Sequence, residues 1–335
     1  ALLAIEEIYL KDLKQPNEYI AFAESSSGVQ FTDFARDSIN FYVAKNFYLN
    51  AEYAKAITNL SDYLQKFPKG YFRNEALYTR ADCYNLQKDY NKALSDYEAL
   101  IANAPNPYEE RSLLKAAIIS YNYTQNFNKA LQYYKTYESK VNSESDKYQA
   151  QLGALRSAFR VGPDSDVKVF GYKIINSNLA NKEEKASAYY YVGKVHLKEK
   201  AVTDAYNAFD AVASMSNNNQ AAEAKYLMAE ILYGQGKIAQ AEKQCNTVTQ
   251  EASNYPYWVA KSIILLSDIY LGRKDLINAR AALEAVIDNF NDDAALVDLA
   301  KNKLKVVQKA EEDQNRIKAP SVPGKLELQS TGGGQ

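Results

Sequence analysis

A short sequence motif returns about every 37 residues, and this period constrains the fold more than any other feature of the chain. The motif is an aromatic or aliphatic residue, a polar pair and a small residue, as in Tyr90-Asn-Lys-Ala93. Its last residues, here called the anchors, are Ala56, Ala93, Ala130, Val167, Ala205, Ala241 and Ala279. Successive anchors are 37, 37, 37, 38, 36 and 38 residues apart. A period this steady predicts a tandem array in which each copy is one structural unit.

Each copy has the hydrophobic spacing of two amphipathic helices of roughly 14 residues. A small residue stands twelve positions before the anchor in five of the seven copies, and an aromatic residue often follows it three positions later. A short polar turn such as Gln87-Lys88-Asp89 separates the two helices. Only 13 Gly and 8 Pro interrupt the 335 residues, so helix breakers are scarce. The sequence therefore predicts an all-α solenoid of about 16 to 17 helices without a β-sheet.

Over residues 37–293 the pattern resembles the tetratricopeptide repeat (TPR) family. The matching features are the small residue and aromatic of the first helix, the Ala of the second helix, and the helix-closing Pro68 and Pro105. The family unit has about 34 residues. The longer unit here makes the chain more similar to long TPR proteins of the bacterial cell envelope. The resemblance implies tandem helix hairpins that form a right-handed superhelix.

The two ends of the chain depart from the repeat. Residues 1–36 are interpreted as an eroded or truncated N-terminal repeat with Glu18 at the anchor, so the chain is expected to be a fragment of a longer repeat protein. Residues 294–318 predict one capping helix, which is apolar at Leu296, Leu299, Leu304 and Val307. Residues 319–335 contain Pro, Ser and three consecutive Gly, and they are expected to form a flexible tail.

The residue types that carry chemistry are scarce. His196 replaces the usual aromatic of its repeat, and Cys83 and Cys245 are four repeats apart, too far for a disulfide, so all three are interpreted as packing residues. Without a convergent nucleophile, base or metal cluster, we expect no enzyme activity, cofactor or metal. Lys and Arg total 40 against 41 acidic residues, which disfavours a nucleic-acid partner. No apolar run is long enough to span a membrane.

The remaining candidate is the surface formed by the first helices. By the TPR resemblance, the second, fifth, ninth and twelfth residues of each unit face a concave groove, counted from Asp37, Asn74, Arg111, Tyr148, Ala186, Ala222 and Ala260. Tyr is common there and is well suited to recognition surfaces. The predicted partner-binding residues are Tyr48, Tyr78, Asn85, Lys115, Asn122, Tyr190, Lys194, Tyr226 and Tyr233. An equal alternative is that these rings pack each first helix on the next.

The function expected from these features is a non-catalytic scaffold that binds a protein or peptide on the concave face, in a bacterial envelope complex. The alternative is a glycan- or peptidoglycan-associated binding module, because Tyr and Asn can stack on and hydrogen-bond to sugars. A chaperone-tail binder is disfavoured, since Phe41, Tyr78, Asp82 and Ile119 occupy positions where that clamp needs Lys, Asn or Arg. The expected location is the periplasm or envelope, with the cytoplasm as the alternative.

Overall fold

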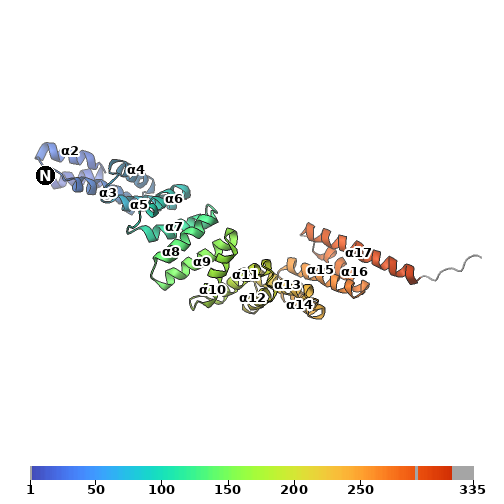
Figure 1. Ribbon diagram of the computed structural model, residues 1–335. Helices are drawn as coiled ribbons and strands as arrows, with labels where there is room; N and C mark the ends of the chain where they lie inside the picture. Colours follow the sequence, from blue (N-terminus) through green and yellow to red (C-terminus); the bar gives the residue numbers. More distant parts are fainter. Residues whose placement is uncertain (1, 291–292, 319–335) are drawn as a thin grey trace, which may run out of the picture. The chain divides into compact units, whose positions relative to one another are not determined.

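Every regular element in the described residues, 2–290 and 293–318, is a helix, as the computed structural model in Figure 1 shows. These ranges contain 17 α-helices and one π-helical segment, η1. The all-α prediction is confirmed, and so is the arrangement in sequential hairpins. The chain divides into two compact units, residues 1–184 and 185–335, called here the N-terminal and C-terminal units.

The N-terminal unit contains the eroded repeat and four further hairpins. Its helices are α1 (Leu2–Glu7), η1 (Ile8–Asp12), α2 (Pro16–Ser27), α3 (Asp33–Leu49), α4 (Tyr53–Lys66), α5 (Arg73–Leu86), α6 (Tyr90–Ala102), α7 (Glu109–Asn122), α8 (Phe127–Lys140), α9 (Glu144–Val161) and α10 (Asp164–Asn176). Consecutive helices pack on one another, and α3 also contacts α5 while α7 contacts α9. Helices α3 and α7 therefore each contact both their own second helix and the next first helix.

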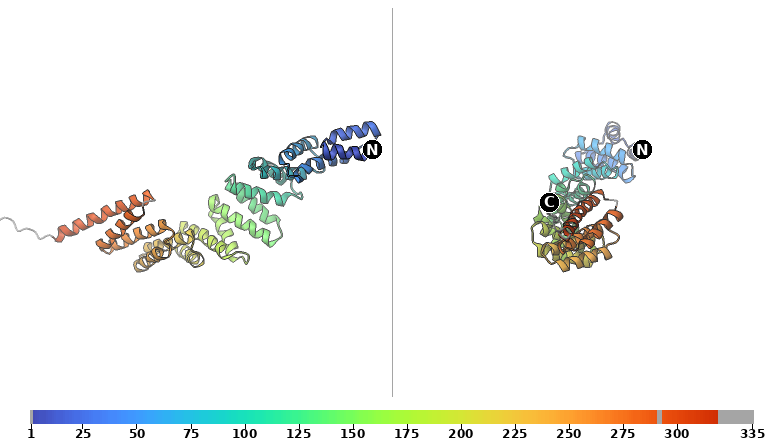
Figure 2. Two further views of the ribbon diagram at one scale, coloured as in Figure 1. Left: turned by 180° about the vertical axis from the view of Figure 1, so that it is seen from behind. Right: turned by 90° about the vertical axis from the view of Figure 1, so that its right-hand side faces the viewer.

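The C-terminal unit repeats this arrangement. Its helices are α11 (Lys182–Lys198), which begins just before the unit boundary, α12 (Val202–Met215), α13 (Asn219–Gly234), α14 (Ile238–Glu251), α15 (Pro256–Gly272), α16 (Leu276–Asn289) and α17 (Ala294–Lys318). Helix α15 contacts α13, α16 and α17, and the last three helices lie side by side in Figure 2.

The turn between the two helices of a hairpin has the same backbone geometry in nearly every repeat. One residue with positive φ ends the first helix, at Lys14, Ala51, Lys88, Gln125, Lys200, Gly236 and Lys274. The next N–H then bonds back to the helix; for example, the Asp89 N–H donates to the Tyr84 carbonyl at 2.9 Å. This closure satisfies carbonyls that the helix end would leave unpaired. The fourth repeat differs, because Gly162 and Pro163 join its helices in extended conformations.

The same geometry shows that residues 1–36 keep the register of the array. Lys14 lies 37 residues before Ala51, and both have a φ of 58°. Counting onward from Lys14 places the anchor on Tyr19, which is buried, and not on the exposed Glu18. The predicted anchor, Glu18, is therefore one residue too early in the sequence. The other anchors are small residues or Val, and the bulky Tyr19 does not fit that pattern.

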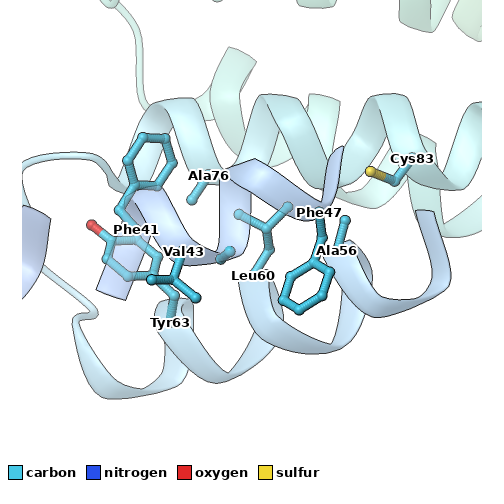
Figure 3. Packing of buried hydrophobic residues seen from close by; sticks show 9 residues of the cluster. Phe41, Val43, Phe47, Ala56, Leu60, Tyr63, Ala76 and Cys83 are labelled. Carbon is cyan, nitrogen blue, oxygen red and sulfur yellow. The ribbon is translucent and has the colours of Figure 1, made fainter. Parts of the chain in front are cut away.

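The seven anchors of the repeats lie in the core of the hairpins. Ala56, Ala93 and Ala130 are fully buried, and so are the later anchors. Figure 3 shows Ala56, Leu60 and Tyr63 of α4 packed against Phe41 and Phe47 of α3. The small residue of the first helix is equally constrained at Gly193, where an added Cβ would lie 2.8 Å from the Phe209 ring.

Helix α17 covers the end of the last hairpin, over the range expected for the capping helix. Leu296, Ala300 and Val307 are buried against α15 and α16, and Leu304 is partly buried there, whereas Leu299 is exposed. Lys303 donates to Asp268 of α15 at 2.6 Å, which adds an ion pair to the apolar contact. The predicted tail, residues 319–335, lies outside the described residues.

Enlarging an anchor should overpack the contact between the two helices. We expect Ala93→Leu to lower the free energy of unfolding by about 1–3 kcal/mol, because buried Ala93 has no room for three more carbons. Urea unfolding followed by circular dichroism measures this loss. Ala102→Leu is the control, since Ala102 is exposed on the same helix. Equal midpoints for the two variants would show that the assigned register is wrong.

Candidate partner-binding surface

The structure divides the nine predicted residues between the two units. Five lie in the N-terminal unit, on α3, α5 and α7, and four lie in the C-terminal unit, on α11 and α13. Their exposure differs widely: Asn122 is exposed, whereas the side chains of Tyr190 and Tyr226 are only 7% and 4% exposed. The nine predicted residues therefore have different roles in the structure.

The fifth-position rings stack on an aromatic residue at the start of the next first helix. Phe41 stacks on Phe72 with 4.7 Å between ring centroids and an interplanar angle of 2°. Tyr78 contacts Tyr108 at 5.1 Å, and Tyr226 contacts Trp258 at 5.6 Å. Ring pairs at these distances add stability beyond the area that they bury. These rings thus join consecutive repeats.

A second contact joins the fifth and ninth residues of one repeat to the second residue of the next. In the C-terminal unit, Glu223 of α13 accepts hydrogen bonds at 2.7 Å from both the Tyr190 hydroxyl and the Lys194 ammonium of α11. The N-terminal unit has the same arrangement, where Lys45 donates to Glu75 at 2.5 Å and lies over the Phe41 ring. These bonds are within the chain, so Tyr190 and Lys194 already have partners.

Two sequence signals could have identified this seam between repeats. An acidic residue at the second position, Glu75 or Glu223, follows a repeat that has Lys at the ninth position. In addition, Phe72, Tyr108 and Trp258 each stand two or three residues before the start of the next unit. Each signal pairs a residue of one repeat with a residue of the next repeat. An alignment that compares the same position in all repeats does not reveal such pairs.

Three predicted residues come together in a hollow between α5 and α7. This α5–α7 hollow has a volume of about 230 Å³ and is lined by Tyr78, Asn85, Arg111, Leu114, Lys115, Ile118, Ile119 and Tyr123. Tyr123 is exposed and is held by stacking on Tyr90, with ring centroids 3.9 Å apart. The Lys115 ammonium lies 3.8 Å from the Asp82 carboxylate, which leaves its other donor directions available. A lining that combines apolar side chains with a few polar ones can hold a side chain of a peptide.

A larger hollow between η1 and α3 was not anticipated. Its volume is about 480 Å³, and its lining is mostly apolar, with Leu10, Ile39, Tyr42, Val43 and Leu49 beside Lys11, Ser38, Lys45 and Asn46. Tyr42 and Leu49 are exposed. None of the nine predicted residues lines it, because the fifth and twelfth positions of that repeat face the α5 side. The sequence of residues 1–36 indicates an eroded repeat and therefore predicts no surface between η1 and α3.

The other predicted residues lie apart from these hollows. Tyr48 of α3 packs partly buried near Tyr53, with ring centroids 6.2 Å apart. Tyr233 of α13 packs partly buried beside Leu232, and Asn122 is exposed at the end of α7. Cys83 and Cys245 are buried and free, and burial raises the pKa of each thiol to about 12. His196 lies with its Nδ1 3.9 Å from the Glu199 carboxylate.

Two further features concern the described residues: groups of metal ligands and helices that could span a membrane. Within residues 2–290 and 293–318, no three side chains of His, Cys, Asp or Glu are grouped so that they could hold a metal ion. No helix in the same ranges is both long and apolar enough to cross a membrane.

Two segments match models described as tetratricopeptide repeat, residues 75–107 and 196–262. The chain is similar to the solved C-terminal part of a TPR repeat-containing protein from Cytophaga hutchinsonii, with 16% identity, a TM-score of 0.53, and coverage of 77% of this chain and 98% of that one. It is also similar to a signal-transduction ATPase with a tetratricopeptide repeat sensor from Pyrococcus horikoshii, with 13% identity, a TM-score of 0.52, and coverage of 92% and 52%. This chain thus spans about half of that protein. These likenesses show the fold, and no curated protein matches the sequence.

Alkaline pH should destabilise the protein through tyrosines that are buried or partly buried in the folded state. Burial, with the nearby Asp82 carboxylate, raises the pKa of Tyr78 to about 12, whereas an unfolded tyrosine ionises at about 10. Because the folded pKa is the higher one, this stabilisation is complete below pH of about 10 and is lost as pH rises toward 12. Urea midpoints measured across this range should fall.

The same titration has a matched pair of variants. Tyr78→Phe should lessen the alkaline decline, since phenylalanine has no proton to lose. Tyr71→Phe removes the hydroxyl of an exposed ring and should leave the decline as in the unchanged protein. A decline of the same size in both variants would contradict a role for the partly buried Tyr78 hydroxyl.

Proposed function

We propose that this chain of tetratricopeptide repeats is a non-catalytic scaffold that binds a peptide segment of a partner protein on the first-helix face of its N-terminal unit. The observation that supports this most is the α5–α7 hollow, which brings Tyr78, Asn85 and Lys115 together. These residues come from two successive repeats, so the site exists only where the repeats are stacked.

The size of the hollow favours a side chain over a whole cofactor. Small-molecule sites usually have volumes of about 300–1,000 Å³. The α5–α7 hollow, at about 230 Å³, is smaller and open to the surface, so it fits one or two side chains of an extended segment. The η1–α3 hollow on the same kind of helix face gives such a segment a second anchoring point.

The chemistry of the lining favours a ligand of mixed polarity. Leu114 and Ile118 provide apolar contact, the Asn85 amide both donates and accepts, and Arg111 and Lys115 supply positive charge. Because Asp82 lies near Lys115 and the whole chain has a net charge of −1, long-range steering contributes little. The affinity should therefore change only modestly with salt.

We infer a bacterial envelope complex as the setting of this scaffold, with the cytoplasm as the alternative. The inference is supported by the repeat length of about 37 residues and by the Tyr-rich, His-poor composition. Fractionation of cells that express the complete gene tests it. Recovery with the periplasmic or membrane fraction is expected, and recovery only with the cytoplasm would contradict it.

Site-directed photo-crosslinking tests the binding surface itself. A photoreactive residue in place of Ile118, which lines the hollow, should form adducts with protein when native membranes are the source of partners. The same residue in place of Gln132, exposed on the second helix α8, should not. Lys115→Ala and Leu114→Ala together should reduce the captured protein at least about fivefold. Because Leu114 also packs against the core beside Leu113, a melting curve must show that the double variant is still folded at the temperature of the assay.

Three results would contradict the proposal. Equal adducts from Ile118 and Gln132 positions would indicate non-specific capture. An undiminished yield with the Lys115 and Leu114 variants would place the partner elsewhere on the chain. Adducts that contain glycan and no protein would favour the alternative function, a glycan- or peptidoglycan-associated module.

A further inference from the structure

The loop between α4 and α5 displays an aromatic ring that the fold does not use. The Tyr71 side chain is 73% exposed, and Phe34 at the start of α3, which meets it edge-on at 5.0 Å, is 51% exposed. Phe72, the neighbour of Tyr71, instead turns inward and stacks on Phe41. The pair Phe34 and Tyr71 is called here the aromatic shelf.

Buried hydrogen bonds hold this loop in one conformation. Asp37 is 2% exposed, and its carboxylate accepts from the Tyr71 N–H at 2.5 Å and from the Tyr63 hydroxyl. The Tyr63 oxygen in turn accepts from the Phe72 N–H at 3.2 Å. Placing a carboxylate in the core is costly unless it is fully hydrogen-bonded, and here its bonds fix the loop.

Gly70 shows how closely the loop approaches these groups. A Cβ at Gly70 would lie 2.6 Å from the Tyr63 hydroxyl and 2.9 Å from the Asp37 carboxylate, so a larger residue would displace the loop. The Gly70 N–H also donates to Phe67, and the Arg73 N–H donates to Gly70. A ring presented by such a fixed loop loses little conformational entropy when a ligand binds.

A polar hollow with positive charge lies beside the aromatic shelf. Its volume is about 420 Å³, and Pro68, Lys69, Gly70, Tyr71, Arg73, Asn74 and Asn103 line it. The Asn103 amide donates to Asn74 at 3.4 Å, which joins the end of α6 to the start of α5 within one repeat. Among the ion pairs of the described residues, neither Lys69 nor Arg73 has a carboxylate partner, whereas most lysines of the first helices do. A carboxylate from outside the chain would complement these two cations.

We propose that this corner, formed by Phe34, Lys69, Tyr71, Arg73, Asn74 and Asn103, is a second docking surface that binds an extended acidic peptide segment of a partner protein. A ligand carboxylate pairs with Arg73 and Lys69, the Asn amides bond to its backbone, and an adjacent prolyl or aliphatic side chain packs on the Tyr71 ring. The surface is separate from the α5–α7 hollow and does not depend on the function proposed for it.

The test uses the whole chain and a fluorescein-labelled peptide of alternating Glu and Pro residues, with fluorescence anisotropy as the readout. The peptide should bind, its affinity should fall as salt is raised, and a twin peptide with Gln in place of Glu should bind at least about tenfold more weakly. Arg73→Glu and Tyr71→Ser should each weaken binding by about tenfold, since both side chains contact the ligand.

Two control variants locate the binding. Lys243→Glu makes the same charge change on an exposed lysine of α14 and should leave the affinity unchanged. Lys115→Ala alters the α5–α7 hollow and should also leave it unchanged. Circular dichroism spectra and melting temperatures of all variants should match those of the unchanged protein, because the substituted side chains are at the surface.

Several results would overturn the proposal. They are equal affinity for the Glu and Gln peptides, no binding of either peptide, or binding that Arg73→Glu leaves intact. Loss of binding with Lys115→Ala alone would place the acidic peptide in the α5–α7 hollow. Saturable binding of a neutral oligosaccharide that Tyr71→Ser abolishes, with no binding of the Glu peptide, would instead assign this corner to glycans.

Discussion

The contact between one repeat and the next carries the stability that a repeat array needs, because each repeat touches only its neighbours. Here that contact is an aromatic seam along the first helices. The fifth-position ring of one repeat packs on a ring at the start of the next first helix, as Tyr226 does on Trp258. Where no such ring follows, Tyr190 and Lys194 reach Glu223 instead. The two most deeply buried of these tyrosines keep a hydrogen-bond partner at the hydroxyl, which is Glu223 for Tyr190 and Glu230 for Tyr226.

The seam decides which residues are left for recognition. A tyrosine committed to its neighbour contributes to the shape of the surface but offers few free groups, and this applies to Tyr190 and Tyr226. Residues beside the seam, such as Asn85 and Lys115, line a hollow that the stacked helices leave open. The loop that leads into α5 adds a second exposed surface. There the buried Asp37 carboxylate accepts a hydrogen bond from the Tyr71 N–H, and the Tyr71 side chain is exposed to solvent. Contacts between repeats and the proposed binding of a partner therefore use neighbouring positions of one helix, and Tyr78 belongs to both.

The sequence predicted the parts of this structure that depend on local spacing. Ala93 and the other anchors could be placed because a small residue recurs at a fixed interval, and α17 could be bounded because its apolar spacing is helical. Of the residues predicted to bind a partner, Tyr78, Asn85 and Lys115 share a hollow, whereas Tyr190 bonds to the next repeat. Whether a fifth-position tyrosine packs on the next repeat depends on two features of that next repeat. They are the second residue of the unit and the aromatic residue at the start of its first helix. Neither feature can be found by examining one repeat alone. The Tyr71 corner was missed because hydrogen bonds to a residue 34 positions away, Asp37, define it.

Hydrogen exchange measured by mass spectrometry on the full chain tests the aromatic seam most directly. If the Tyr226 ring joins two repeats, Tyr226→Ala should speed amide exchange in both α13 and α15 and leave α3 to α6 unchanged. Tyr226→Phe keeps the stacked ring and should exchange nearly as the unchanged protein does. Faster exchange confined to α13, or equal exchange in the Ala and Phe variants, would contradict the account in which stacked rings hold successive repeats together.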